Sequence, residues 1–184
     1  MLDWMPNYAQ NISTCSYIRV IQHIITIIIK FKTINKLKNK IKKISLNTGI
    51  STFPMPAAVI SVGVGEEANL ITLAYVGKVC ATPPIIAISM RPMRHSYGLI
   101  EKHGEFVINY PTKDQLKEMD YCGTKSGRDV NKWDELNLTK EQGVVVKVPM
   151  VKEFPWNMEC KVIKRIEFGS HISYFGEVVA THSD

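Results

Sequence analysis

Side chains that can bind an anion gather in the middle of the chain: Ser89, Arg91, Arg94, His95 and Ser96. Ser89 lies near the end of an apolar run over 85–90 that is typical of a strand, Arg91, Arg94 and His95 follow this run, and a helix is predicted to begin at Ser96. Guanidinium forks, hydroxyls and the free N–H groups of a helix start are suitable donors for a phosphate monoester. The pattern favours a phosphate site, although exposed arginines at a strand end fit the composition equally well.

The elements around this cluster are predominantly strands. An uncharged, β-rich run over 70–76 is separated from the strand over 85–90 by a turn at Thr82, Pro83 and Pro84. Further strands are predicted over 57–64, 105–109, 143–148, 157–167 and 173–182, and short helices over 96–103, 113–121 and 130–136.

This order of elements predicts a mainly β fold. Strands outnumber helices without an alternating strand–helix rhythm, so a β-barrel is favoured over a doubly wound sheet. No Gly-x-Gly-x-x-Gly motif leads from a strand into a helix, which argues against a Rossmann cofactor site. In the second helix, Leu116 and Met119 are expected to pack inward, and 123–127 is expected to form a loop.

Several ordered blocks of sequence resemble the flavin reductase-like family, the FMN-binding split barrels that include the flavoredoxins. The blocks are residues 69–79, 89–97, 104–109, 120–133, 169–171 and 175–179. The resemblance runs from about Phe53 to the end of the chain. It implies a split β-barrel with a few short helices and FMN as the cofactor. Family members usually continue beyond the strand that ends near Asp184, so we expect a C-terminus that is short for the family.

The resemblance also implies which residues hold FMN, whose phosphate carries about two negative charges. Thr72, Ala74 and Tyr75 would line the flavin ring, because a strand edge offers N–H and C=O groups and Tyr75 offers an aromatic face. The residues that would hold the phosphate are Ser89, Arg91, Arg94 and Ser96. The cofactor-binding set is completed by Asn69, Leu73, His95 and Lys132.

Two residues are candidates for a catalytic role on the same basis. A cation at Lys132 near the N1/O2 edge of the ring would stabilise reduced flavin and raise its potential. The alternative for Lys132 is a solvated helix lysine. His171, in a Gly-Ser-His context, would face a nicotinamide or another electron donor, and its alternative is a hydrogen-bonded structural histidine.

We therefore expect an FMN-binding oxidoreductase that transfers electrons from NADH or NADPH to a flavin, a metal or a protein acceptor. The alternative is a flavoredoxin-type carrier that shuttles electrons between protein partners without oxidising NAD(P)H. A third class is an FMN-binding module without redox turnover. The family further implies a homodimer, and we expect a cytoplasmic protein.

The first part of the chain differs from the rest in its charge. The formal net charge is +6, and residues 1–47 hold eight basic residues against one acidic residue. The remainder, 48–184, holds 15 basic and 16 acidic residues and is nearly neutral, so nucleic-acid binding by the barrel is not expected. We interpret 1–47 as a basic Ile/Lys/Asn-rich leader and 48–184 as the folded domain.

The leader has no single interpretation. Its apolar run over 17–31 is interrupted by charged and polar residues and is too short to span a bilayer, which takes about 20 residues. Lysines follow this run, whereas a secretory signal places its positive charge first. Three interpretations of the leader remain: an amphipathic surface helix, a weakly membrane-associating segment, and translated sequence upstream of the true start. We favour the last, and we expect no firm membrane association.

The cysteines give no sign of a metal site or a disulfide. Cys15, Cys80, Cys122 and Cys160 are widely spaced, without a Cys-x-x-Cys pair. Reduced and mostly buried thiols are expected.

Overall fold

The computed structural model describes residues 24–30, 32–33 and 55–184. The chain divides into two units, Met1–Thr52 and Phe53–Asp184. In the first unit, the described residues are helical and exposed. Among the described residues, no helix has the length and apolar character needed to cross a membrane. The predicted domain boundary near residue 47 lies outside the described residues.

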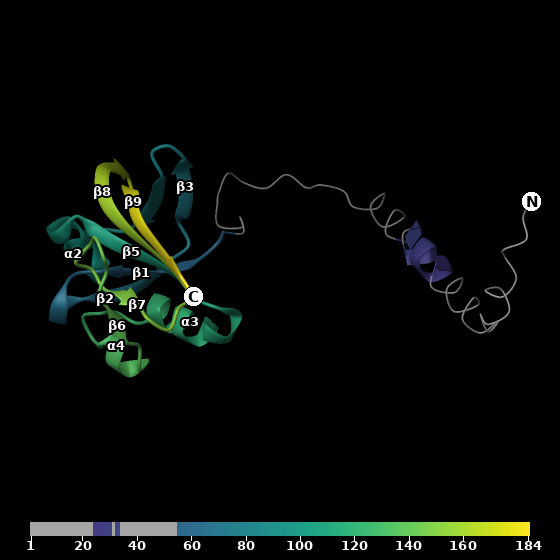
Figure 1. Cartoon of the computed structure of the whole chain (residues 1–184), viewed down its shortest axis with the longest axis horizontal. Coiled ribbons are helices and arrows are strands. Elements are labelled where there is room, and N and C mark those ends of the chain that lie inside the picture. The colour runs from purple at the N-terminus through teal and green to yellow at the C-terminus, as the bar shows by residue number, and fades with distance from the viewer. Residues whose placement is uncertain (1–23, 31, 34–54) are drawn as a thin grey trace, which may run out of the picture. The chain divides into compact units, whose positions relative to one another are not determined.

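The second unit is built on one antiparallel sheet of seven strands (Figure 1). In chain order the strands are β1 (Ala58–Val62), β2 (Asn69–Leu73), β3 (Val76–Cys80), β4 (Ile85–Met90), β5 (Glu105–Tyr110), β8 (Trp156–Phe168) and β9 (His171–Ser183). Their order in the sheet is β2-β1-β5-β8-β9-β4-β3. A small second sheet pairs β6 (Lys140–Glu141) with β7 (Met150–Val151).

Five short helical segments connect the strands. The α-helices are α2 (His95–His103), α3 (Leu116–Thr124) and α4 (Lys132–Glu135), and the 3-10 turns are η1 (Gly65–Glu67) and η2 (Lys113–Gln115). In Figure 1, α3 and α4 lie with β6 and β7 at one end of the sheet. The observed architecture is a split β-barrel, as predicted.

The sheet curls because its two edge strands are neighbours in the chain. Only Ala74 and Tyr75 separate β2 from β3, although these strands stand at opposite ends of the sheet order. The carbonyl of Tyr75 accepts a hydrogen bond from the N–H of Ser89 at 2.9 Å. The end of β4 therefore lies beside the link between the two edges, and residues from both edges reach one place.

Apolar side chains from the strands and α2 fill the interior of this curl. Fully buried members include Ile60, Ile88, Phe106 and Ile108. A second cluster joins β1 and β2 to Cys122 of α3 and Trp133 of α4. The helices that carry candidate site residues are thus packed against the strand that carries the others.

Most predicted elements are confirmed within a few residues. The first helix ends at Gly104, which takes a left-handed backbone with φ of 64°, as expected for a glycine stop. The long strands β8 and β9 cover the predicted segments over 157–167 and 173–182. The predicted single strand over 70–76 is wrong, because the chain breaks at Ala74 and continues as the exposed edge strand β3.

Two predictions for the second helix are also wrong. Leu116 is 55% exposed, whereas Met119 packs against the second core cluster as expected. The segment opens with the 3-10 turn η2, which rotates the faces relative to one continuous α-helix. The helix also extends to Thr124, so the predicted loop over 123–127 begins later.

The predicted strand over 143–148 does not form, and a buried carboxylate explains why. Glu159 on β8 is fully buried and accepts hydrogen bonds from the N–H groups of Val144, Val145 and Val146 at 2.7–2.8 Å. His182 on β9 also contacts this carboxylate at 2.7 Å. The carboxylate takes the place of a neighbouring strand as the acceptor for this backbone.

Replacing Glu159 with glutamine is expected to lower the free energy of unfolding by about 2–4 kcal/mol, because the NH2 group that replaces one carboxylate oxygen cannot accept hydrogen bonds from the buried N–H groups. Urea denaturation of wild type, Glu159→Gln and the exposed control Glu141→Gln would measure this. An effect equal to that of the control would contradict the assigned role.

The same comparison has a predicted pH dependence. Burial raises the pKa of Glu159, but the three backbone hydrogen bonds and His182 outweigh it and leave the pKa below its ordinary value. A carboxylate of this kind stabilises the fold above its unfolded pKa, about 4.3, and loses that contribution as pH falls through the folded pKa. The stability difference between wild type and Glu159→Gln should therefore be constant near neutral pH and shrink below about pH 4.3.

Candidate functional site

Three adjoining cavities run along one side of the barrel. The strand cavity, about 320 Å³, is lined by Thr72, Leu73, Ala74, Tyr75, Ser89, Arg91 and His171 among others. The central cavity, about 230 Å³, includes Ser96, Cys122, Ser126 and Lys132. The outer cavity, about 290 Å³, includes Glu66, Glu67, Asp129 and Asn131.

Shared lining residues show that the three cavities adjoin one another in a row. Ile71, Arg94 and Gly123 line both the strand cavity and the central cavity. The residues that line both the central and the outer cavity are Asn69, His95, Gly127 and Arg128. A guanidinium group therefore stands at each of the two junctions.

The strand cavity is built from the free edge of β2 and the link to β3. Among the described strands, β2 pairs only with β1, so the backbone groups on its other edge face the cavity. The ring of Tyr75 contacts the ring of His171, with centroids 4.8 Å apart. The hydroxyl of Thr72 donates to the carbonyl of Met119, which fixes α3 against this strand.

The far wall of the strand cavity comes from β4 and β9. The hydroxyls of Ser89 and Ser173 lie 2.6 Å apart where the two strands pair. Arg91 follows β4 and is exposed, and its guanidinium has no partner among the described residues. This cavity thus combines a strand edge, two aromatic rings and a free cation.

The start of α2 supplies hydrogen-bond donors to the central cavity. Arg94 is its N-cap, with an extended backbone and no side-chain cap. The N–H groups of His95 and Ser96 therefore have no acceptor within the helix. Ser96 is 1% exposed, and its hydroxyl oxygen accepts from the amide of Asn69 at 2.9 Å, which leaves its hydrogen free to donate.

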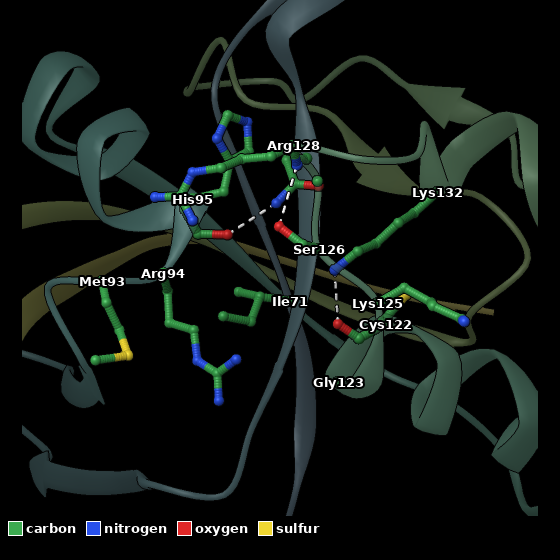
Figure 2. A pocket seen from close by; sticks show the side chains of 13 residues that line it. Ile71, Met93, Arg94, His95, Cys122, Gly123, Lys125, Ser126, Arg128 and Lys132 are labelled. Atoms are coloured by element: carbon green, nitrogen blue, oxygen red, sulfur yellow. Dashed lines mark hydrogen bonds between the residues drawn. The ribbon is translucent and has the colours of Figure 1, made fainter.

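A glycine lets the loop over 125–128 close against these residues. A Cβ on Gly127 would lie 2.3 Å from Asn69 Oδ1 and 2.8 Å from His95 Cδ2, so no other residue fits without displacement. In Figure 2, Arg128 extends across the cavity toward His95, whereas Arg94 extends in a different direction.

Lys132 contributes a buried cation to the central cavity. It is 2% exposed, and its ammonium donates to the carbonyl of Leu70 at 2.6 Å. It also donates to the carbonyl of Cys122 at 2.7 Å (Figure 2). One N–H remains, and no carboxylate among the described residues pairs with it. Burial lowers the pKa of Lys132, the Cys122 thiol opposes this shift, and nearby Arg94 adds to it.

The thiol of Cys122 is not a reactive group in this setting. Burial raises its pKa to about 11, and the neighbouring Lys132 only partly offsets this. Cys122 is therefore a protonated, structural thiol at neutral pH.

The structure brings the predicted site residues together but divides them between cavities. Ser89 and Arg91, predicted at the phosphate, line the same cavity as Thr72, Ala74 and Tyr75. Lys132, predicted at the ring, lines the central cavity with Ser96. The site list from sequence omitted lining residues of the next loop, namely Lys125, Ser126, Gly127 and Arg128. The sequence feature that could have identified these residues is the Ser-Gly-Arg segment within the block over 120–133.

Comparisons with known proteins agree with this architecture. The chain is 31% identical to the flavoredoxin of Desulfovibrio vulgaris (Miyazaki F), with a TM-score of 0.72 over 78% of this chain and 77% of that one. A flavoredoxin from Methanosarcina acetivorans is also 31% identical, with a TM-score of 0.71 over 78% and 76% of the two chains. An NADH-dependent FMN reductase of Streptomyces nodosus subsp. asukaensis is 25% identical over 71% of this chain and 69% of its own length.

The family model of the flavin reductase like domain matches residues 50–184, which include every candidate site residue. The curled antiparallel sheet and its helices are those of the FMN-binding split barrels to which the chain is similar. The chain therefore belongs to the flavin reductase-like family.

Proposed function

We propose that the strand and central cavities together hold FMN, with the ring in the strand cavity and the phosphate in the central cavity. The observation that carries this proposal is their junction, where Arg94 stands between a strand edge and a helix start. Small-molecule sites typically measure about 300–1,000 Å³, a range that the two cavities reach together.

The donors in the central cavity fit a phosphate. Arg94 offers a guanidinium fork, Ser96 a hydroxyl hydrogen, and the start of α2 its free N–H groups. The remaining N–H of Lys132 adds a buried positive charge that lacks a counter-ion among the described residues. An anion placed here would offset part of the cost of burying that charge.

The strand cavity would provide for the ring and for access to it. The free edge of β2 offers backbone donors and acceptors, and Tyr75 and His171 form an aromatic wall. When bound, FMN supplies reversible electron transfer between a donor and an acceptor. His171 is the residue that we place next to an incoming donor, and Arg91 is a free cation beside it.

We propose that the protein is an oxidoreductase that takes electrons from NADH or NADPH, in line with the FMN reductase to which it is similar. The second candidate is an electron carrier between proteins, which the two flavoredoxins at 31% identity favour. Assembly as a homodimer and a cytoplasmic location stay predictions.

The visible spectrum of the purified protein, before and after anaerobic NADH or NADPH, separates these functions. A yellow protein that bleaches is the expected result for the oxidoreductase. A yellow protein that bleaches only with a reduced protein donor would establish the carrier. A colourless protein that FMN does not reconstitute would overturn the proposed site.

Replacing Arg94 with glutamine is expected to weaken FMN binding about tenfold or more, because charge-assisted hydrogen bonds contribute about 1.5–3 kcal/mol. The loss should shrink at high salt, which screens the same charge in wild type. Fluorescence titration with FMN at two salt concentrations measures this, with exposed Lys152→Gln as the charge-matched control. Equal affinities of Arg94→Gln and the control would remove Arg94 from the site.

Replacing Lys132 with glutamine tests whether its charge reaches the ring. Glutamine retains N–H donors for the two carbonyls but carries no charge. We expect a lower flavin potential, by about 30 mV for each tenfold loss in preference for the two-electron reduced form. A flavin potential equal to that of wild type, with FMN still bound and thermal stability unchanged, would show that the charge of Lys132 acts on the phosphate and not on the ring.

A further inference from the structure

The two cavities that we assign to FMN have basic side chains in their lining and no acidic ones. Residues 48–184 hold 15 basic and 16 acidic residues. Five of the basic residues line the strand cavity or the central cavity, whereas none of the acidic residues does so. The five are Arg91, Arg94, Lys125, Arg128 and Lys132. A nearly neutral domain therefore concentrates positive charge around these cavities.

This charge exceeds what the cofactor needs. The phosphate of FMN carries about two negative charges, and we assign it to Arg94 and the buried Lys132. Arg91, Lys125 and Arg128 then remain, all of them exposed and without an ion-pair partner among the described residues. Three unpaired cations around adjoining cavities produce a local positive field that attracts acidic molecules.

The segments that carry these cations also expose an apolar side chain. Arg91 and Met93 lie in the link between β4 and α2, and Lys125 and Arg128 follow the end of α3. Met93 is 68% exposed and lines the central cavity, and Figure 2 shows it on the opposite side of that cavity from Lys125. Methionine and arginine are both enriched in protein–protein interfaces. A small anion makes no use of an exposed apolar side chain, so the combination favours a protein partner.

Carboxylates limit this positive surface on one side. Beyond Arg128, the outer cavity is lined by two exposed carboxylates, Glu66 and Asp129. Like charges that face each other across an interface repel, and this suppresses wrong orientations of a partner. An acidic partner would be attracted to the strand and central cavities and repelled from the outer cavity. The pattern of charge would therefore orient it over the cavities that we assign to FMN.

We propose that Arg91, Met93, Lys125 and Arg128 form a docking surface, the basic rim, for an acidic one-electron redox protein that exchanges electrons with bound FMN. This inference rests on the proposed FMN site and names the class of partner that it serves. One electron passes between the metal centre of the partner and the flavin in each encounter. Two partner molecules therefore change oxidation state for each two-electron change of FMN, and protons are exchanged with water. The same surface would serve a partner that accepts electrons and one that supplies them.

Stopped-flow reduction of the FMN-loaded full chain by reduced plant-type ferredoxin, an acidic [2Fe–2S] protein, tests this surface. Attraction between opposite charges raises the association rate at low salt, and salt screens that attraction. We expect the second-order rate of flavin bleaching to fall about tenfold between about 20 mM and 200 mM NaCl. Oxidation of the reduced protein by cytochrome c, which is basic, should show no such fall. A fall of equal size with cytochrome c would overturn the proposed charge complementarity.

Residues 1–47 are also basic, so matched substitutions are needed to locate the attraction. All variants are saturated with FMN before the measurement, and dithionite verifies that the bound flavin can be reduced. Lys125→Gln/Arg128→Gln should lower the rate with ferredoxin about tenfold at low salt. The control Lys161→Gln/Lys164→Gln removes the same charge from exposed positions on β8 and should behave as wild type.

Met93→Ser tests the apolar part of the basic rim separately. It removes an apolar contact and no charge, and such changes act mainly on dissociation. We expect it to raise the ferredoxin concentration that gives the half-maximal rate, with the salt dependence unchanged. A half-maximal concentration equal to that of wild type would remove Met93 from the surface.

Equal rates for Lys125→Gln/Arg128→Gln and its control would overturn the basic rim as the docking surface. A bound flavin that dithionite reduces and ferredoxin does not would overturn it as well. Both results would leave the proposed FMN site intact, whereas failure of the chain to bind FMN would overturn the site and the docking surface together. Thermal unfolding of each variant checks that the exposed substitutions leave the fold intact.

Discussion

The buried ammonium of Lys132 is the interaction on which the geometry of the site depends. It joins the carbonyl of Leu70 in β2 to that of Cys122 in the last turn of α3. Burying an unpaired charge costs several kcal/mol, and here two carbonyls and the negative end of a helix dipole offset part of it. Lys132 also lines the central cavity, so the interaction that fixes the helices leaves the cavity positive.

The curl of the sheet determines which other groups lie near the Lys132 ammonium. Because β2 and β3 are consecutive yet stand at opposite edges, the end of β4 lies beside the end of β2. The chain then turns directly into α2, whose start is tied to β2 by the hydrogen bond from Asn69 to Ser96. A strand edge, a helix start and a buried cation therefore lie around the same row of cavities, although they come from distant segments.

The sequence predicted the strands and helices where local pattern decides them. Apolar runs gave β1 and β4, and a glycine stop gave the end of α2. Local pattern failed over 143–148, because the acceptor for that backbone is a carboxylate on a distant strand. The assignment of Ser89 and Ser96 to one phosphate group stays a prediction, and the two residues line adjoining cavities that share Arg94.

Charged side chains are unevenly distributed along the row of cavities. The strand and central cavities contain Arg91, Arg94 and Lys132 without a paired carboxylate among the described residues, whereas the outer cavity has free carboxylates beyond Arg128. A uniformly anionic ligand would be attracted at one end and repelled at the other. The strand and central cavities, which hold the unpaired cations, are therefore the ones suited to a phosphate-bearing cofactor.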